Sequence, residues 1–75
     1  MITRDNIQEV VNSLSDRDKK RIRNSNKEFV VLELHCTNSG CASFAKVTNN
    51  YTRYKNVSNN GDCILSIDDP IFSNI

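Results

Sequence analysis

The chain is poor in several residue types that mark particular functions. It has no tryptophan, one proline and two glycines, and its ten Lys and Arg nearly balance nine Asp and Glu, for a net charge of +1. Two glycines are too few for a glycine-rich loop that holds phosphate groups. The balanced charge gives no overall attraction to nucleic acid or to an anionic membrane. Any electrostatic partner has to be recognised by a local cluster of charges.

Long apolar runs are also missing from the sequence. No segment approaches the length of a bilayer span. The first residues, "MITRDNIQEV", lack the basic and apolar regions of a secretory signal. We therefore expect a cytoplasmic protein without a membrane partner.

The length of 75 residues corresponds to one small domain, in which folding buries only about 60% of the surface. A substrate cleft would take its lining from the same few apolar side chains that form the core. No pair of carboxylates is brought together by its spacing. We expect a single domain over residues 1–75 that is not an enzyme and that uses no cofactor and no small-molecule substrate.

Helical periodicity is confined to the first third of the chain. Ile7, Val10, Val11 and Leu14 recur at the helical spacing, and Thr3 can cap the helix that they predict, over about 4–14. Ser15, with Asp18 three residues later, predicts the start of a second, surface helix over about 16–24. Ile22 is its one clear core residue.

Alternating apolar residues predict strands in the rest of the chain, at about 28–36, 41–47, 51–57 and 62–67. Asn60-Gly61 is the strongest hairpin signal. The expected fold class is α+β, with two N-terminal helices followed by a three- to four-stranded antiparallel meander. The apolar residues Ile71 and Phe72 in the tail either dock on the core or bind a partner, and we favour docking.

Residues 35–41 contain the single histidine and two of the three cysteines. A four-residue loop over 37–40 places Cys36 opposite Cys41 and, by alternation, turns His35 to the other face of the sheet. A Cys/His nucleophile is therefore excluded, and zinc, which needs four ligands, fits the spacing poorly. A cross-strand disulfide is geometrically possible. Because we expect a reducing compartment, we predict two reduced thiols and no metal.

The two sheet faces have different compositions. One face is apolar and is expected to pack on the helices: Val30, Leu32, Leu34, Cys36, Cys41, Ser43, Ala45 and Val47. The other face is a candidate for partner binding, and the third strand adds to it Tyr54 in one register or Tyr51, Arg53 and Lys55 in the other. The candidate partner-binding residues are Phe29, Val31, Phe44, Lys46, Tyr51, Arg53, Tyr54 and Lys55. Alternatively, these aromatic residues complete a small core with the tail.

The segment "RDKKRIR" forms a possible basic patch of Arg17, Lys20, Arg21 and Arg23. An acidic first turn followed by basic residues also matches the helix dipole, and Asp16 can pair with Lys19 and Lys20. We favour this second interpretation, a solvated helix without a nucleic-acid partner.

These features lead to the hypothesis of a small non-catalytic protein that binds a macromolecular protein partner through its sheet face or an edge strand. By analogy of size and composition, it would be an inhibitor or regulator of the kind that phages and mobile elements encode, acting on a host or nuclease complex. The partner could also be a ribonucleoprotein or a second copy of the chain. One alternative is nucleic-acid binding by the aromatic and basic sheet face. A further alternative is a small zinc-supported domain.

Overall fold

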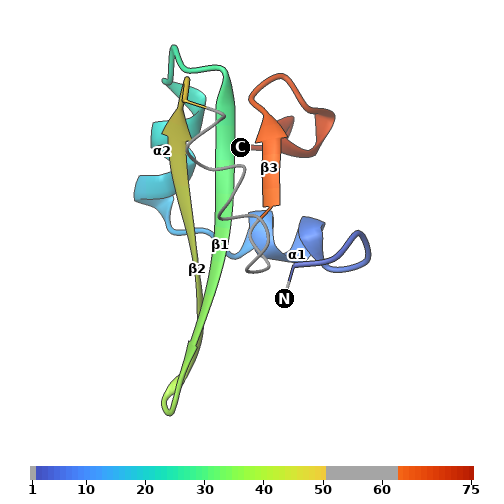
Figure 1. Cartoon of the computed structure of the whole chain (residues 1–75), viewed down its shortest axis with the longest axis vertical. Coiled ribbons are helices and arrows are strands. Elements are labelled where there is room, and N and C mark those ends of the chain that lie inside the picture. The colour runs from blue at the N-terminus through green and yellow to red at the C-terminus, as the bar shows by residue number, and fades with distance from the viewer. Residues whose placement is uncertain (1, 51–62) are drawn as a thin grey trace.

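Two short helices and three antiparallel strands make up the described part of the chain, which is residues 2–50 and 63–75 of the computed structural model (Figure 1). The predicted α+β class is confirmed. In chain order the elements are α1 (Ile7–Asn12), α2 (Asp16–Arg23), β1 (Phe29–Thr37), β2 (Gly40–Thr48), β3 (Cys63–Ser66) and the short 3₁₀ helix η2 (Pro70–Phe72).

Helix α1 is shorter than the sequence predicts, and the predicted Thr3 cap is wrong. The carbonyl of Thr3 accepts hydrogen bonds from the N–H groups of Asn6 (3.3 Å) and Ile7 (3.0 Å), which makes a separate turn before the helix. Asn6 is the N-cap residue. The apolar stripe is nevertheless confirmed, because Val10, Val11 and Leu14 are all buried.

Helix α2 begins where the sequence predicts. The Ser15 hydroxyl accepts a hydrogen bond from the Asp18 N–H at 3.2 Å, which satisfies one of the free donors of the first turn. Acidic residues lie in its first turn and basic residues in its last, as the helix dipole favours. Ile22 is buried, as predicted.

The sheet has the strand order β2-β1-β3, so the predicted meander is wrong for its last strand. That strand pairs with β1, with Val30 opposite Leu65 and Leu32 opposite Cys63. Strand β1 therefore has a strand neighbour on each of its two edges. The strand predicted at 51–57 and the Asn60-Gly61 turn lie outside the described residues.

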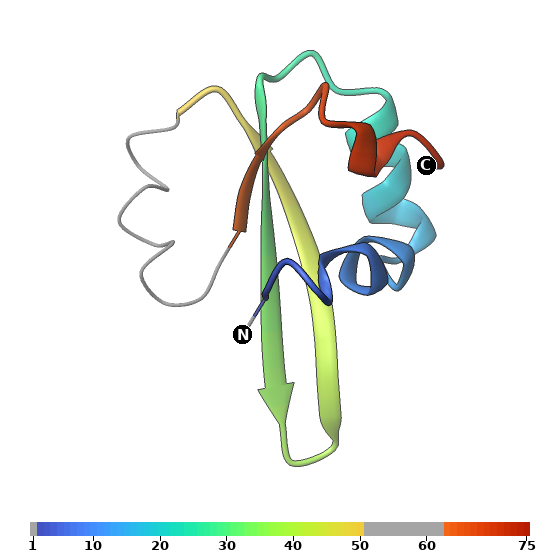
Figure 2. The ribbon, with the colours of Figure 1, turned by 90° about the vertical axis from the view of Figure 1, so that its right-hand side faces the viewer.

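The core lies between one face of the sheet and the helices. Figure 2 shows α1, α2 and the C-terminal segment on the same side of the sheet. Val30, Leu32 and Ala45 from the strands pack there with residues of both helices and with Phe72 of the tail, which is 8% exposed. The predicted docking of the tail is confirmed, and the Asp69 side chain caps η2 by accepting from the Ile71 N–H at 3.0 Å.

The hairpin of β1 and β2 extends beyond the helices (Figures 1 and 2). Its predicted register is confirmed, including Glu33 opposite Phe44 and Cys36 opposite Cys41. The strands run one residue further than expected, so that Thr37 pairs with Gly40 and only two residues form the loop. Gly40 has a φ of +133°, a backbone conformation that side chains rarely permit.

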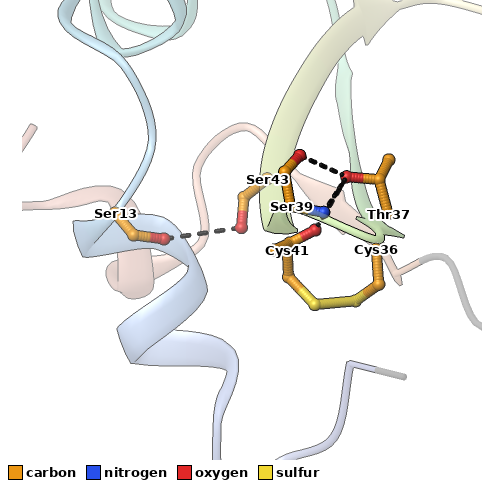
Figure 3. The surroundings of a disulfide bond; sticks show 7 residues. Ser13, Cys36, Thr37, Ser39, Cys41 and Ser43 are labelled. Carbon is orange, nitrogen blue, oxygen red and sulfur yellow. Dashed lines mark hydrogen bonds between the residues drawn. A yellow bond between two sulfur atoms is a disulfide. The ribbon is translucent and has the colours of Figure 1, made fainter.

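The prediction of reduced thiols at the hairpin end is wrong, because Cys36 and Cys41 form a disulfide with an S–S distance of 2.01 Å (Figure 3). Both residues are exposed, since the helices end short of this part of the sheet, and so they do not contribute to the core as expected. Figure 3 also shows Ser13, after α1, reaching Ser43 of β2 with 3.4 Å between the hydroxyl oxygens. The disulfide therefore holds the free end of the hairpin.

Reduction of this disulfide is expected to weaken the domain without unfolding it. The bond joins residues only five apart, and closing so short a loop contributes about 2 kcal/mol to the free energy of unfolding. Urea unfolding with and without dithiothreitol measures the difference, and the Cys36→Ser/Cys41→Ser variant should match the reduced protein. Cys63→Ser is the control and should keep the full response to the reductant. Complete unfolding on reduction would contradict this account.

Candidate binding face on the sheet

Glu33 is a nearly buried carboxylate on the face of the sheet that carries Phe29, Val31 and His35. It is 7% exposed and lies in β1, directly opposite Phe44 of β2. One carboxylate oxygen lies 3.0 Å from His35 Nε2 and the other 3.1 Å from Lys46 Nζ. A buried carboxylate needs such partners, because an unpaired charge is costly to remove from water.

These contacts set the charge state of Glu33. Burial alone would raise the pKa of its carboxyl group, but the hydrogen bonds from His35 and Lys46, together with their charges, outweigh burial and hold the pKa below the ordinary value of 4.5. Glu33 is therefore an anion that fixes the positions of two basic side chains. The sequence places these residues on one face but does not single out Glu33.

The lowered pKa of Glu33 predicts a loss of stability in acid. A carboxyl group whose pKa is lower in the folded state stabilises the fold above its unfolded pKa, and the stabilisation is lost as the pH falls through the folded pKa. We expect the free energy of unfolding to fall between pH 7 and pH 3 by more in the wild type than in Glu33→Gln. Urea unfolding of both proteins at about pH 7 and about pH 3 measures the difference. An identical pH dependence of the two proteins would contradict the assignment.

Phe44 is the one large apolar side chain that is extensively exposed among the described residues, at 47%. The His35 ring packs edge-on against it, with 5.4 Å between the ring centroids and an interplanar angle of 74°. The tail does not cover it, because Phe72 belongs to the core on the helix side. The alternative in which the tail and the aromatic residues of this face form a second core is therefore wrong for Phe44.

Helix α2 adds charged groups to the same region. Asp18 and Arg21 line one open depression of about 390 Å³ together with Glu33, His35, Phe44, Ala45 and Lys46. The Arg21 guanidinium lies 3.7 Å from the Asp18 carboxylate, which is nearly buried. We call Arg21, His35, Phe44 and Lys46 the Phe44 surface. It presents an aromatic ring beside basic groups, above two carboxylates that already have partners.

The other predicted partner-binding residues are placed differently. Val31 is fully buried and Phe29 is half-buried, so neither offers a partner much surface. Phe44 and Lys46 are exposed, as the hypothesis requires. The rest lie outside the described residues: Tyr51, Arg53, Tyr54 and Lys55.

The predicted basic patch is divided by the structure. Arg17, Lys20 and Arg21 line one depression, together with Lys27 from the loop after α2. Arg23 instead lines a second depression beside Asp68 and Phe72. The predicted pairing of Asp16 with Lys19 and Lys20 is wrong, because the ion pair found within α2 joins Asp18 to Arg21.

The disulfide bears directly on the metal hypothesis. It removes Cys36 and Cys41 from the possible thiolate ligands of zinc, and the third cysteine, Cys63, is partly buried in β3. Burial and the nearby Asp69 carboxylate raise the pKa of the Cys63 thiol, which favours its neutral form. Within residues 2–50 and 63–75, no group of three His, Cys, Asp or Glu side chains is arranged to hold a metal ion.

In the described ranges, neither α1 nor α2 has the length and apolar character that crossing a membrane requires. No protein-family model, curated protein or solved structure matches the chain.

Proposed function

We propose that the chain is a small non-catalytic protein that binds a protein partner through the Phe44 surface. The observation that supports this proposal is the exposure of Phe44, which is 47% exposed within a rim of charged side chains. Aromatic residues are common anchors of protein interfaces, where a few side chains carry most of the binding energy. A polar rim around an apolar centre is typical of such interfaces.

The face of the sheet is a better candidate than its edge. Helix α2 contacts β2, and its Asp18 and Arg21 lie around the same depression as Phe44 and Lys46. Phe44 and Lys46 point away from the core and remain accessible on the face. We therefore place the partner over the face, with Phe44 at the centre of the contact.

The finer proposal is an inhibitor or regulator encoded by a phage or mobile element, acting on a host or nuclease complex. Its support is the small size of the chain and a surface with an exposed aromatic side chain. A ribonucleoprotein or a second copy of the chain is also a suitable partner.

The cytoplasmic location stays a hypothesis, and the Cys36–Cys41 disulfide argues against it. Disulfides persist mainly in oxidising compartments. Alkylating thiols in intact cells before lysis distinguishes the two locations. A protein kept in a reducing cytoplasm would carry the alkylating label on all three cysteines, whereas an oxidised one would carry it on Cys63 alone.

The two alternative functions are less well supported. Nucleic-acid binding by the sheet face would use Lys46, but its ammonium group is already 3.1 Å from the Glu33 carboxylate. Its other residues, Arg53 and Lys55 with Tyr51 or Tyr54, lie outside the described part of the chain. A zinc-supported domain would need ligands other than the two cysteines of the disulfide.

Affinity capture with matched baits tests the proposal. Immobilised wild-type protein, Phe44→Ala and the hairpin-tip control Asn38→Ala are exposed to extract of the producing cells, and the retained proteins are identified by mass spectrometry. We expect a protein that the wild type and Asn38→Ala retain and that Phe44→Ala loses. Sedimentation of the purified variants tests self-association in the same way. The proposal would be refuted if Phe44→Ala retained the same proteins as the wild type and also self-associated to the same extent.

A further inference from the structure

Four basic side chains surround one open depression between α2, the loop that follows it and β2. Its volume is about 450 Å³. The lining consists of Arg17, Lys20, Arg21, Asn24, Ser25, Asn26, Lys27 and Val47. It contains no carboxylate. We call this region the basic depression.

Three of the four cations in the basic depression have no internal counter-charge. Arg21 is paired with Asp18 at 3.7 Å. Across the part of the chain that the structure describes, the ion pairs are Arg21–Asp18, His35–Glu33 and Lys46–Glu33, so Arg17, Lys20 and Lys27 take part in none. Their charges are therefore free to attract an anion from solution.

Most backbone N–H groups beside the depression are already used. The N–H of Asn24 bonds to the carbonyls of Lys20 and Ile22, and that of Ser25 bonds to Ile22. The N–H of Lys27 bonds to the Ser25 hydroxyl at 3.0 Å. The depression also lies at the end of α2 whose dipole repels anions. A single phosphate bound by backbone donors is therefore disfavoured, and the separated side-chain cations suit an anion with several charges.

The geometry points to the backbone of a single-stranded nucleic acid as the occupant, and we propose that the basic depression binds it. Arg, Lys, Ser and Asn are the side chains that contact phosphates and sugars in such complexes. Val47 and the apolar stems of Arg17 and Lys20 provide surface against which a flat base can lie, and guanidinium groups also stack on bases. A flexible single strand can bring both its phosphates and its bases to the lining of an open depression. The basic depression shares Arg21 with the Phe44 surface, but the inference does not depend on the proposed function, because it uses neither Phe44 nor Lys46.

Fluorescence anisotropy with a fluorescein-labelled oligothymidylate of about 20 nucleotides tests the proposal, since a strand of that length covers at least one such site. We expect binding at low salt that weakens by about 20- to 50-fold between 50 and 200 mM NaCl, as three or four phosphate contacts predict. Lys20→Glu/Lys27→Glu should weaken binding at least about tenfold, since it removes contacts and introduces repulsion.

The control variant Arg4→Glu/Lys19→Glu has the same change in net charge, but neither residue lines the basic depression. It should bind within about threefold of the wild type, since salt largely screens charges that lie outside the contact. Circular dichroism melting establishes that every variant is folded. Equal losses in the two double variants would overturn the proposal, and so would an absence of binding at low salt.

Fluorescein-labelled poly(L-glutamate) of similar length separates nucleic acid from an acidic protein. We expect the oligonucleotide to bind at least about tenfold more tightly, because carboxylate side chains lack the flat bases that stack in the depression. Equal or tighter binding of poly(L-glutamate) would overturn the proposal in favour of an acidic protein partner.

Discussion

Phe72→Ala is expected to destabilise the domain by about 3 to 5 kcal/mol, the usual cost of deleting a buried phenyl ring. Phe72 is 8% exposed and packs with Val10, Val11, Ile22 and Leu32 in the core. The substitution leaves a cavity between the helices and the sheet, which so few neighbouring side chains cannot fill. A small domain has a total stability near the lower end of the usual range of about 5 to 15 kcal/mol, so much of the population should unfold.

Thermal and urea unfolding, followed by circular dichroism, measure this effect. Phe72→Leu is the matched control, because it keeps most of the apolar contact and should cost much less than Phe72→Ala. A Phe72→Ala variant with the stability of the wild type would show that the tail is not part of the core.

Phe44→Ala is expected to have the opposite pattern, with little change in stability and a large loss of binding. A substitution at an exposed position usually changes the free energy of unfolding by no more than about 0.5 kcal/mol, and Phe44 is 47% exposed. If the ring is the anchor of the interface, its removal should weaken partner binding by at least about 2 kcal/mol, or about 30-fold in Kd.

Titration calorimetry with the partner recovered by affinity capture measures the loss of binding, and urea unfolding of the free variant measures its stability. Phe44→Leu is the matched control, since it keeps an apolar side chain of similar reach and should retain part of the affinity. Early melting or aggregation of Phe44→Ala would show that the ring stabilises the fold and would remove it from the binding surface.

The hairpin could be predicted from the sequence in detail, because two independent signals agree on it. Alternation decides which residues share a face, and the turn fixes the register at which the strands pair. Together they predict the pairs Glu33 with Phe44 and Cys36 with Cys41, both of which the structure contains. The strand order could not be predicted in the same way, because the partner of β3 lies far away in the sequence.

The disulfide could have been predicted from the sequence, but the expected cellular compartment argued against it. The predicted register already placed Cys36 directly opposite Cys41, where their side chains can be joined. The expectation of a reducing compartment, which rests on the first residues and on the lack of a long apolar run, outweighed that geometry. The structure shows that local geometry was the better guide.

The Phe44 surface could be predicted only in part. Alternation places Glu33, His35 and Phe29 on one face, but it cannot show that Glu33 is nearly buried or that Lys46 reaches across the strands to it. A charged residue within the apolar run "VVLEL" is the signal that could have revealed it, because buried charges require partners. Likewise, Lys27 joins Lys20 only through the path of the loop after α2.

Fluorine NMR of the chain labelled with 4-fluorophenylalanine tests most directly whether the Phe44 surface binds the partner. The sequence contains three phenylalanines, and single Phe→Leu variants at Phe29 and Phe44 assign their resonances. We predict that adding the captured partner shifts the Phe44 resonance, while the resonance of the buried Phe72 stays in place. A partner that binds without shifting the Phe44 resonance would contradict the account.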